Sequence, residues 1–103
     1  MKYYNKLIRD KIPEIMRNAG KEFKLRLATD DEYDLLLKKK LIEECYEYYK
    51  SGEAEELADI IEVIMAILTN NNMTYNELES IRLNKMWERG SFTKKIVLEY
   101  AED

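Results

Sequence analysis

The chain has 103 residues, of which 46% are hydrophobic and 37% are charged, and this length predicts a single domain over residues 1–103. Only three glycines and one proline are present, which disfavours a turn-rich sandwich or barrel and a disordered linker. No apolar run approaches the roughly 20 residues that span a bilayer, so no membrane partner is expected.

The cysteine and histidine counts limit the chemistry. The single cysteine, Cys45, cannot form an internal disulfide, which favours a reducing compartment, and we predict an inert core thiol there. Residues 1–11 carry charges where a signal peptide needs an apolar stretch, so the expected location is cytoplasmic. The chain contains no histidine, the commonest zinc ligand and general base, so oxygen ligands are expected for any metal.

Charge is distributed unevenly beneath the net charge of −4. Residues 1–28 hold eight Lys and Arg against three Asp and Glu, whereas residues 29–62 hold four against twelve. This segregation favours an anionic ligand bound through a cation, although ordinary solvated faces explain the same pattern. The acidic balance and the few basic residues argue against a nucleic-acid partner.

The first third of the chain predicts one short helix and one extended run. Asp10 is expected to cap a helix that has Pro13 in its first turn and ends at Gly20. Residues 23–27 then alternate apolar and basic side chains, which is the period of a half-buried strand. Residues 29–32 have the capping-box spacing and begin a long helix that reaches about residue 50.

The rest of the chain predicts two more helices and a last extended run. A helix over about residues 53–69 follows the Ser51–Gly52 turn, and a second capping box at Thr74 begins a helix that ends at Arg89. Residues 96–98 read as a short strand that could pair with residues 23–27 as a two-stranded ribbon. The predicted fold is all-α, with an antiparallel helical hairpin as the core of an oligomeric helical bundle.

Two pairs of carboxylates flank the predicted turn between the central helices. Glu44 and Glu47 precede it, Glu56 and Asp59 follow it, and both pairs have the i, i+3 spacing of one helix face. Folding at Ser51–Gly52 sets the two pairs opposite each other, roughly 7–11 Å from the turn. Facing carboxylates at this distance can enclose a small cation.

The helix that carries the second pair is apolar on nearly all sides, since residues 57–68 read LADIIEVIMAIL. Such a helix is expected to be buried, and buried carboxylates need counter-charge from a metal, Lys or Arg. Oxygen ligands without histidine favour Mg²⁺, with Mn²⁺ as the alternative. A monomer of this length has few elements to surround that helix, so at least a dimer is expected. The competing interpretation of the carboxylates is a solvated acidic edge.

These carboxylates carry a resemblance to a known family. Glu43-Glu44-x-x-Glu47 followed by Glu56-x-x-Asp59 resembles the EExxE…ExxD motif of the all-α nucleotide pyrophosphohydrolases of the MazG and phosphoribosyl-ATP pyrophosphohydrolase superfamily. Residues 4–14, YNKLIRDKIPE, and residues 84–92, NKMWERGSF, are similar to one branch, the house-cleaning pyrophosphatases for noncanonical nucleoside triphosphates. The resemblance therefore covers essentially the whole chain.

The resemblance implies Mg²⁺-dependent hydrolysis of a nucleoside triphosphate to a monophosphate and pyrophosphate. It places metal ligands at Glu44, Glu47, Glu56 and Asp59, and we expect Glu43 or Glu47 to orient the water as a catalytic residue. Only eight residues separate Glu47 from Glu56, fewer than in typical MazG proteins, so their substrate preference does not transfer. The family usually forms dimers or higher assemblies, which implies a homodimer or homotetramer.

Triphosphate binding needs positive charge beyond the metal. The opening motif and the last predicted helix supply the candidate substrate-binding residues, which are Lys6, Arg9, Lys11, Asn84, Lys85 and Arg89. Two other functions remain open: phosphoribosyl-ATP pyrophosphohydrolase, which the opening motif disfavours, and a non-catalytic helical module that binds cations or a protein through its acidic hairpin. The sequence leaves the base, the sugar and the number of metal ions open.

Overall fold

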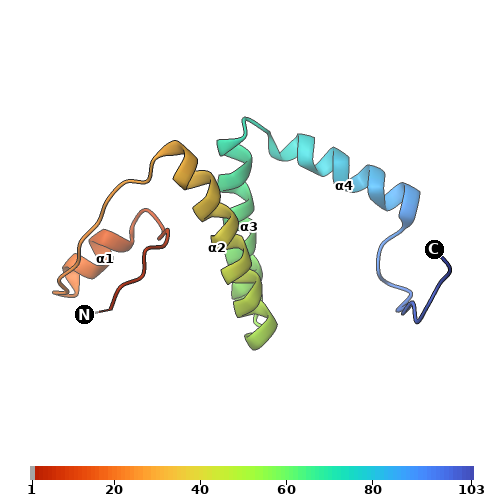
Figure 1. The fold of residues 1–103 in the computed structure, drawn as a ribbon, viewed down its shortest axis with the longest axis horizontal. Coiled ribbons are helices and arrows are strands. Elements are labelled where there is room, and N and C mark those ends of the chain that lie inside the picture. Colours follow the sequence, from red (N-terminus) through yellow and green to blue (C-terminus); the bar gives the residue numbers. More distant parts are fainter. Residues whose placement is uncertain (1) are drawn as a thin grey trace. The chain divides into compact units, whose positions relative to one another are not determined.

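The computed structural model describes residues 2–103, and these residues form four α-helices and no strand (Figure 1). The predicted all-α class is therefore confirmed. The chain divides into two compact units, Met1–Asn72 and Met73–Asp103. The first unit contains α1 (Ile12–Asn18), α2 (Asp30–Ser51) and α3 (Ala54–Asn70), and the second contains α4 (Tyr75–Arg89). None of the helices formed by residues 2–103 combines the length and the apolar character that a membrane crossing requires.

Helix α2 begins where the capping-box spacing predicts. The side chain of Thr29 accepts a hydrogen bond of 3.2 Å from the backbone N–H of Glu32, which satisfies one of the free donors at the helix N-terminus. Three acidic side chains occupy the first turn of α2, where the helix dipole favours negative charge. Local capping and charge therefore set the start of the longest helix.

The turn between α2 and α3 depends on Gly52. This residue has φ +67°, the left-handed conformation that favours glycine, and its N–H donates a 2.8 Å hydrogen bond to the carbonyl of Tyr48. Helix α3 resumes at Ala54, so the connection is short, and α2 and α3 pack along each other (Figure 1). The turn thereby fixes which residues of the two helices face one another.

The core of the described residues is small. Only Leu37 on α2 and Val63 and Leu68 on α3 are buried, and no charged side chain is. Leu57, Ile61 and Met65 instead expose 43%, 56% and 40% of their surface, and their spacing of four places them along one side of α3. The expectation that this helix is surrounded is therefore not met within one chain, and three apolar side chains remain uncovered.

The start of α1 corrects one prediction. Lys11 rather than Asp10 is the N-cap residue, and no side chain caps this helix end. Proline stands at the start of the helix as predicted, because its fixed φ suits the first turn and its missing N–H removes no helical bond. Asp10 is thus one position too early to cap the first turn.

The predicted ribbon is wrong for the described residues. Residues 23–27 and 96–98 form no strand, and they belong to different units. Leu27, Ile96 and Val97 are 96%, 82% and 81% exposed. A pair of strands this short is marginal without a third strand or a helix to cover it, so the alternation of side chains alone does not produce a ribbon.

The second unit follows the capping prediction. Thr74 accepts a 3.1 Å hydrogen bond from the N–H of Glu77, and Gly90 ends α4. Trp87 and Phe92 expose 80% and 98% of their surface, so neither aromatic ring is part of a core in this unit. Cys45 is also exposed, contrary to the predicted core thiol.

We predict that Gly52→Ala lowers the free energy of unfolding by about 1 kcal/mol, since a Cβ is strained at positive φ. A Cβ at this position would meet no atom within 4 Å, so the cost comes from the backbone and not from a clash. Gly52→Asn should cost less, because asparagine tolerates this conformation. Urea unfolding of the three proteins measures the series, and an alanine variant as stable as the parent would contradict the role given to this turn.

Candidate metal centre and its counter-charges

Three carboxylates from two helices converge on one side of the α2–α3 pair. Glu44 on α2 and Glu56 and Asp59 on α3 each present an oxygen, and these oxygens all lie within 4.8 Å of one another. All three side chains are partly buried. The i, i+3 spacing aligns Glu56 with Asp59 on one face of α3, and the short turn brings Glu44 across from them.

The arrangement fits a small divalent cation. Mg²⁺ binds oxygen ligands at about 2.0–2.1 Å, so ligands on opposite sides of the ion are about 4 Å apart. Oxygens within 4.8 Å need only a small side-chain adjustment to reach that separation. Mg²⁺ also keeps waters and commonly uses few protein carboxylates together with phosphate oxygens, so three carboxylates are a sufficient set.

The surroundings of Glu56 disfavour the ionised form of its carboxyl group. Desolvation is the main cause that raises the pKa of its carboxyl group above the ordinary value of 4.5, and the charges of Asp59, Glu47 and Glu44 raise it further. A raised pKa means that the ionised form is disfavoured in the folded protein.

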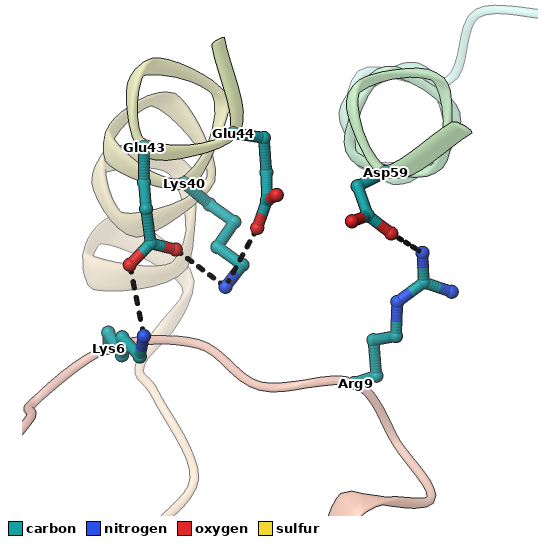
Figure 2. Close-up of polar contacts among 6 residues, drawn as sticks. All are labelled: Lys6, Arg9, Lys40, Glu43, Glu44 and Asp59. Atoms are coloured by element: carbon teal, nitrogen blue, oxygen red, sulfur yellow. Dashed lines mark hydrogen bonds and ion pairs between the residues drawn. The ribbon is translucent and has the colours of Figure 1, made fainter. Parts of the chain in front are cut away.

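Asp59 already has a cationic partner. Nη2 of Arg9 donates a hydrogen bond of 2.7 Å to Oδ1 of Asp59, and the residues are 50 positions apart in the sequence. Figure 2 shows the Arg9 side chain rising from the opening segment to meet α3. The pair is exposed, with 56% and 37% of the two side chains accessible, so it contributes at most about 1 kcal/mol.

A second set of ion pairs holds Glu43 and Glu44 on α2. Lys6 donates to Oε1 of Glu43 at 3.0 Å, while Lys40 contacts Oε2 of Glu43 at 2.7 Å and Oε1 of Glu44 at 3.3 Å (Figure 2). Hydrogen bonds from Lys40 and then Lys6 lower the pKa of the Glu43 carboxyl group. Burial acts to lower the pKa of Lys40, but its bonds to the two glutamates outweigh burial and raise it.

A hollow of about 250 Å³ opens beside these groups. Its lining combines three cations, two carboxylates and two isoleucines: Lys6, Arg9, Lys40, Glu44, Asp59, Ile8 and Ile12. The hollow is large enough for several waters or a polyatomic anion. Negative groups of the metal candidate and positive groups of the opening segment therefore border the same space.

The other predicted residues are placed as follows. Glu47 is partly buried on α2, one turn after Glu44, and is not one of the three converging carboxylates, although its charge reaches Glu56. Lys11 is the N-cap residue of α1. The remaining three predicted substrate contacts lie on α4, in the second unit, and their role stays a prediction: Asn84, Lys85 and Arg89.

Sequence reasoning missed Lys40. It contacts two site glutamates, and only 18% of its side chain is exposed. The sequence does contain a signal for these contacts, because Glu43 and Glu44 follow Lys40 by three and four residues, which is the spacing of helical ion pairs. The basic residues of the opening motif were identified, but their direct pairing with Glu43 and Asp59 was not.

Comparison with known proteins gives no relative for this arrangement. No family model matches the chain, and neither the curated proteins nor the solved structures contain a match.

We predict that Glu56→Gln leaves the melting temperature of the metal-free protein unchanged or raises it, because the substitution removes like-charge repulsion and a desolvated charge. Glu55→Gln is the matched control, since Glu55 is an exposed acidic residue in the same first turn of α3. It should lower the melting temperature slightly by weakening the helix-dipole interaction. Thermal unfolding with EDTA present measures both variants.

The stability difference between Glu56→Gln and the parent should depend on pH. Because the pKa of Glu56 is higher in the folded state, this carboxyl group stays protonated to a higher pH in the folded protein than in the unfolded chain. Ionisation of Glu56 therefore destabilises the fold as the pH rises above 4.5. The advantage of Glu56→Gln over the parent should therefore grow from pH 4.5 to neutral pH. A Glu56→Gln variant that melts below the Glu55→Gln control at neutral pH would show that Glu56 is a structural partner and not a repelled carboxylate.

Proposed function

We propose that the protein is a metal-dependent pyrophosphohydrolase that converts a nucleoside triphosphate, canonical or noncanonical, into a monophosphate and pyrophosphate. The observation that carries the proposal is the convergence of Glu44, Glu56 and Asp59 beside a hollow lined by three cations. A divalent ion at one edge and basic side chains at the other suit a polyphosphate, whose charge needs both. The motif resemblance described above agrees with this choice.

In this proposal Glu44, Glu56 and Asp59 hold Mg²⁺, or Mn²⁺ in its place, and Glu47 is a further ligand candidate. The ion would neutralise phosphate charge and lower the pKa of the attacking water. Glu47 is better placed than Glu43 to orient that water, because Lys6 and Lys40 occupy the two oxygens of Glu43. Lys6 and Arg9 border the hollow and would bind phosphate oxygens.

The reaction class gives a direct test. With Mg²⁺ and a panel of canonical and damaged nucleoside triphosphates, we expect release of pyrophosphate and the corresponding monophosphate. Glu56→Gln should reduce the rate by orders of magnitude, because the site loses a ligand charge, whereas Glu55→Gln should retain activity. Release of orthophosphate with a diphosphate product would contradict cleavage between the α and β phosphates.

The same panel separates the alternatives. Hydrolysis of phosphoribosyl-ATP in preference to all triphosphates would assign the protein to histidine biosynthesis. A non-catalytic helical module is favoured by one observation, namely that Glu43 and Asp59 already have basic partners within the chain. No turnover with any metal, together with Mg²⁺ binding that Glu56→Gln weakens, would support a module that binds cations without catalysis.

We also propose that the α2–α3 pair is the core of a homodimer or homotetramer. The exposed stripe formed by Leu57, Ile61 and Met65 lies on one side of α3, and Ile42, Tyr46 and Tyr49 form a comparable stripe on α2, where they are 70%, 57% and 83% exposed. Exposed apolar stripes of this kind are typical of surfaces that associate. A second copy would cover them with the same residues.

We predict that Ile61→Glu shifts the protein toward the monomer, because a charge at the centre of the stripe would be buried without a partner. Leu27→Glu is the control, since Leu27 is equally apolar and 96% exposed but lies outside the helices. Light scattering at micromolar concentration measures the mass of each protein. A parent protein that is strictly monomeric would contradict assembly through this surface.

A further inference from the structure

The opening segment bridges both helices of the candidate metal centre. Lys6 contacts Glu43 on α2 at 3.0 Å, and Arg9, three residues later, contacts Asp59 on α3 at 2.7 Å. Figure 2 shows the two side chains rising from one stretch of chain, with Lys40 and Glu44 between them. This segment therefore supplies counter-charge to Glu43 on one helix and to Asp59 on the other.

Arg9 and the cation compete for one carboxylate. Asp59 is one of the three carboxylates that converge, and its Oδ1 accepts the hydrogen bond from Arg9. A divalent ion that draws Asp59 towards Glu44 and Glu56 faces a guanidinium charge at that carboxylate, and the two positive charges repel each other. Metal binding therefore weakens the contact that ties the opening segment to α3.

Resting on the function proposed above, we propose that Arg9 is an exchangeable counter-ion: it is bound to Asp59 in the metal-free protein and is transferred to the phosphate of the substrate when the metal binds. Arg9 lines the hollow together with Lys6 and Lys40, so a small rotation of its side chain suffices to meet an anion there. A guanidinium binds a phosphate through two parallel hydrogen bonds, as it does a carboxylate.

The strength of the contact allows such an exchange. The Arg9–Asp59 pair is more than one-third exposed on both sides, and exposed pairs of this kind change an equilibrium by no more than roughly fivefold. A metal can displace it at little cost. By contrast, Lys40 is 18% exposed and contacts two glutamates of its own helix, so it stays in place as the fixed charge of the site.

The exchange couples the two ligands. Metal binding frees Arg9 for the anion, so metal and anion each bind more tightly when the other is present, and thermodynamic linkage requires the effect to be reciprocal. The site thereby favours a metal together with a phosphate over a free metal ion. Arg9 is therefore a binding residue that also makes the site prefer the metal together with phosphate over the metal alone.

Mn²⁺ binding to the 103-residue chain, followed by electron paramagnetic resonance of the free ion, tests the exchange without any turnover. We expect Arg9→Gln to bind Mn²⁺ roughly threefold more tightly than the parent, because no guanidinium has to be displaced. Arg26→Gln is the matched control. It removes the same charge, but Arg26 pairs with Glu32 and is not part of the site, so any general electrostatic effect appears in it as well.

Binding of inorganic tripolyphosphate supplies the second readout. The parent should bind tripolyphosphate more tightly with Mn²⁺ than without it, and Arg9→Gln should lose part of this gain because it has no guanidinium to transfer. Arg26→Gln should keep the gain.

The outcomes separate the two proposals. If the parent binds Mn²⁺ and Glu56→Gln does not, the metal centre stands. Equal Mn²⁺ affinity in Arg9→Gln and Arg26→Gln, or an undiminished gain of tripolyphosphate affinity in Arg9→Gln, then overturns the exchange of Arg9 alone. If parent and Glu56→Gln bind Mn²⁺ equally weakly, the metal centre itself is contradicted, and the exchange falls with it.

Discussion

The convergence of three carboxylates carried by two packed helices is the feature around which the ion pairs of the first unit are arranged. Glu44, Glu56 and Asp59 lie with oxygens within 4.8 Å of one another, and desolvation and neighbouring negative charge raise the pKa of Glu56. Like charges at this separation destabilise a fold unless a cation compensates them. The opening segment compensates part of this charge, because Arg9 pairs with Asp59, while Lys6 pairs with the neighbouring Glu43.

Much of the first unit could be predicted because local rules decide it. Thr29 caps α2 and Gly52 ends it, as the residue types demand. Once the turn is known, helical periodicity places Glu44 across from Asp59, and the two residues do converge. Capping residues, a left-handed glycine and i, i+3 spacing act over a few residues, so one sequence is enough to read them.

The rest depends on interactions that one sequence does not display. The contact between Arg9 and Asp59 spans 50 positions. Predicting it would have needed the path of the opening segment as well as the charges of the two residues. Residues 23–27 alternate apolar and basic side chains as a strand would, yet the described residues contain no second strand with which they could pair. Helix α3 is apolar enough to be core, yet among the described residues of this helix only Val63 and Leu68 are buried, while Leu57, Ile61 and Met65 stay exposed.

A crystal structure with Mn²⁺, in which anomalous scattering locates the metal, tests the central claim most directly. The account predicts a peak between Glu44, Glu56 and Asp59, with carboxylate oxygens at the distances of direct ligands. Arg9 should then have left Asp59. A peak elsewhere, or no peak at Mn²⁺ concentrations far above those that stabilise the protein, would contradict the assignment of these three carboxylates as a metal centre.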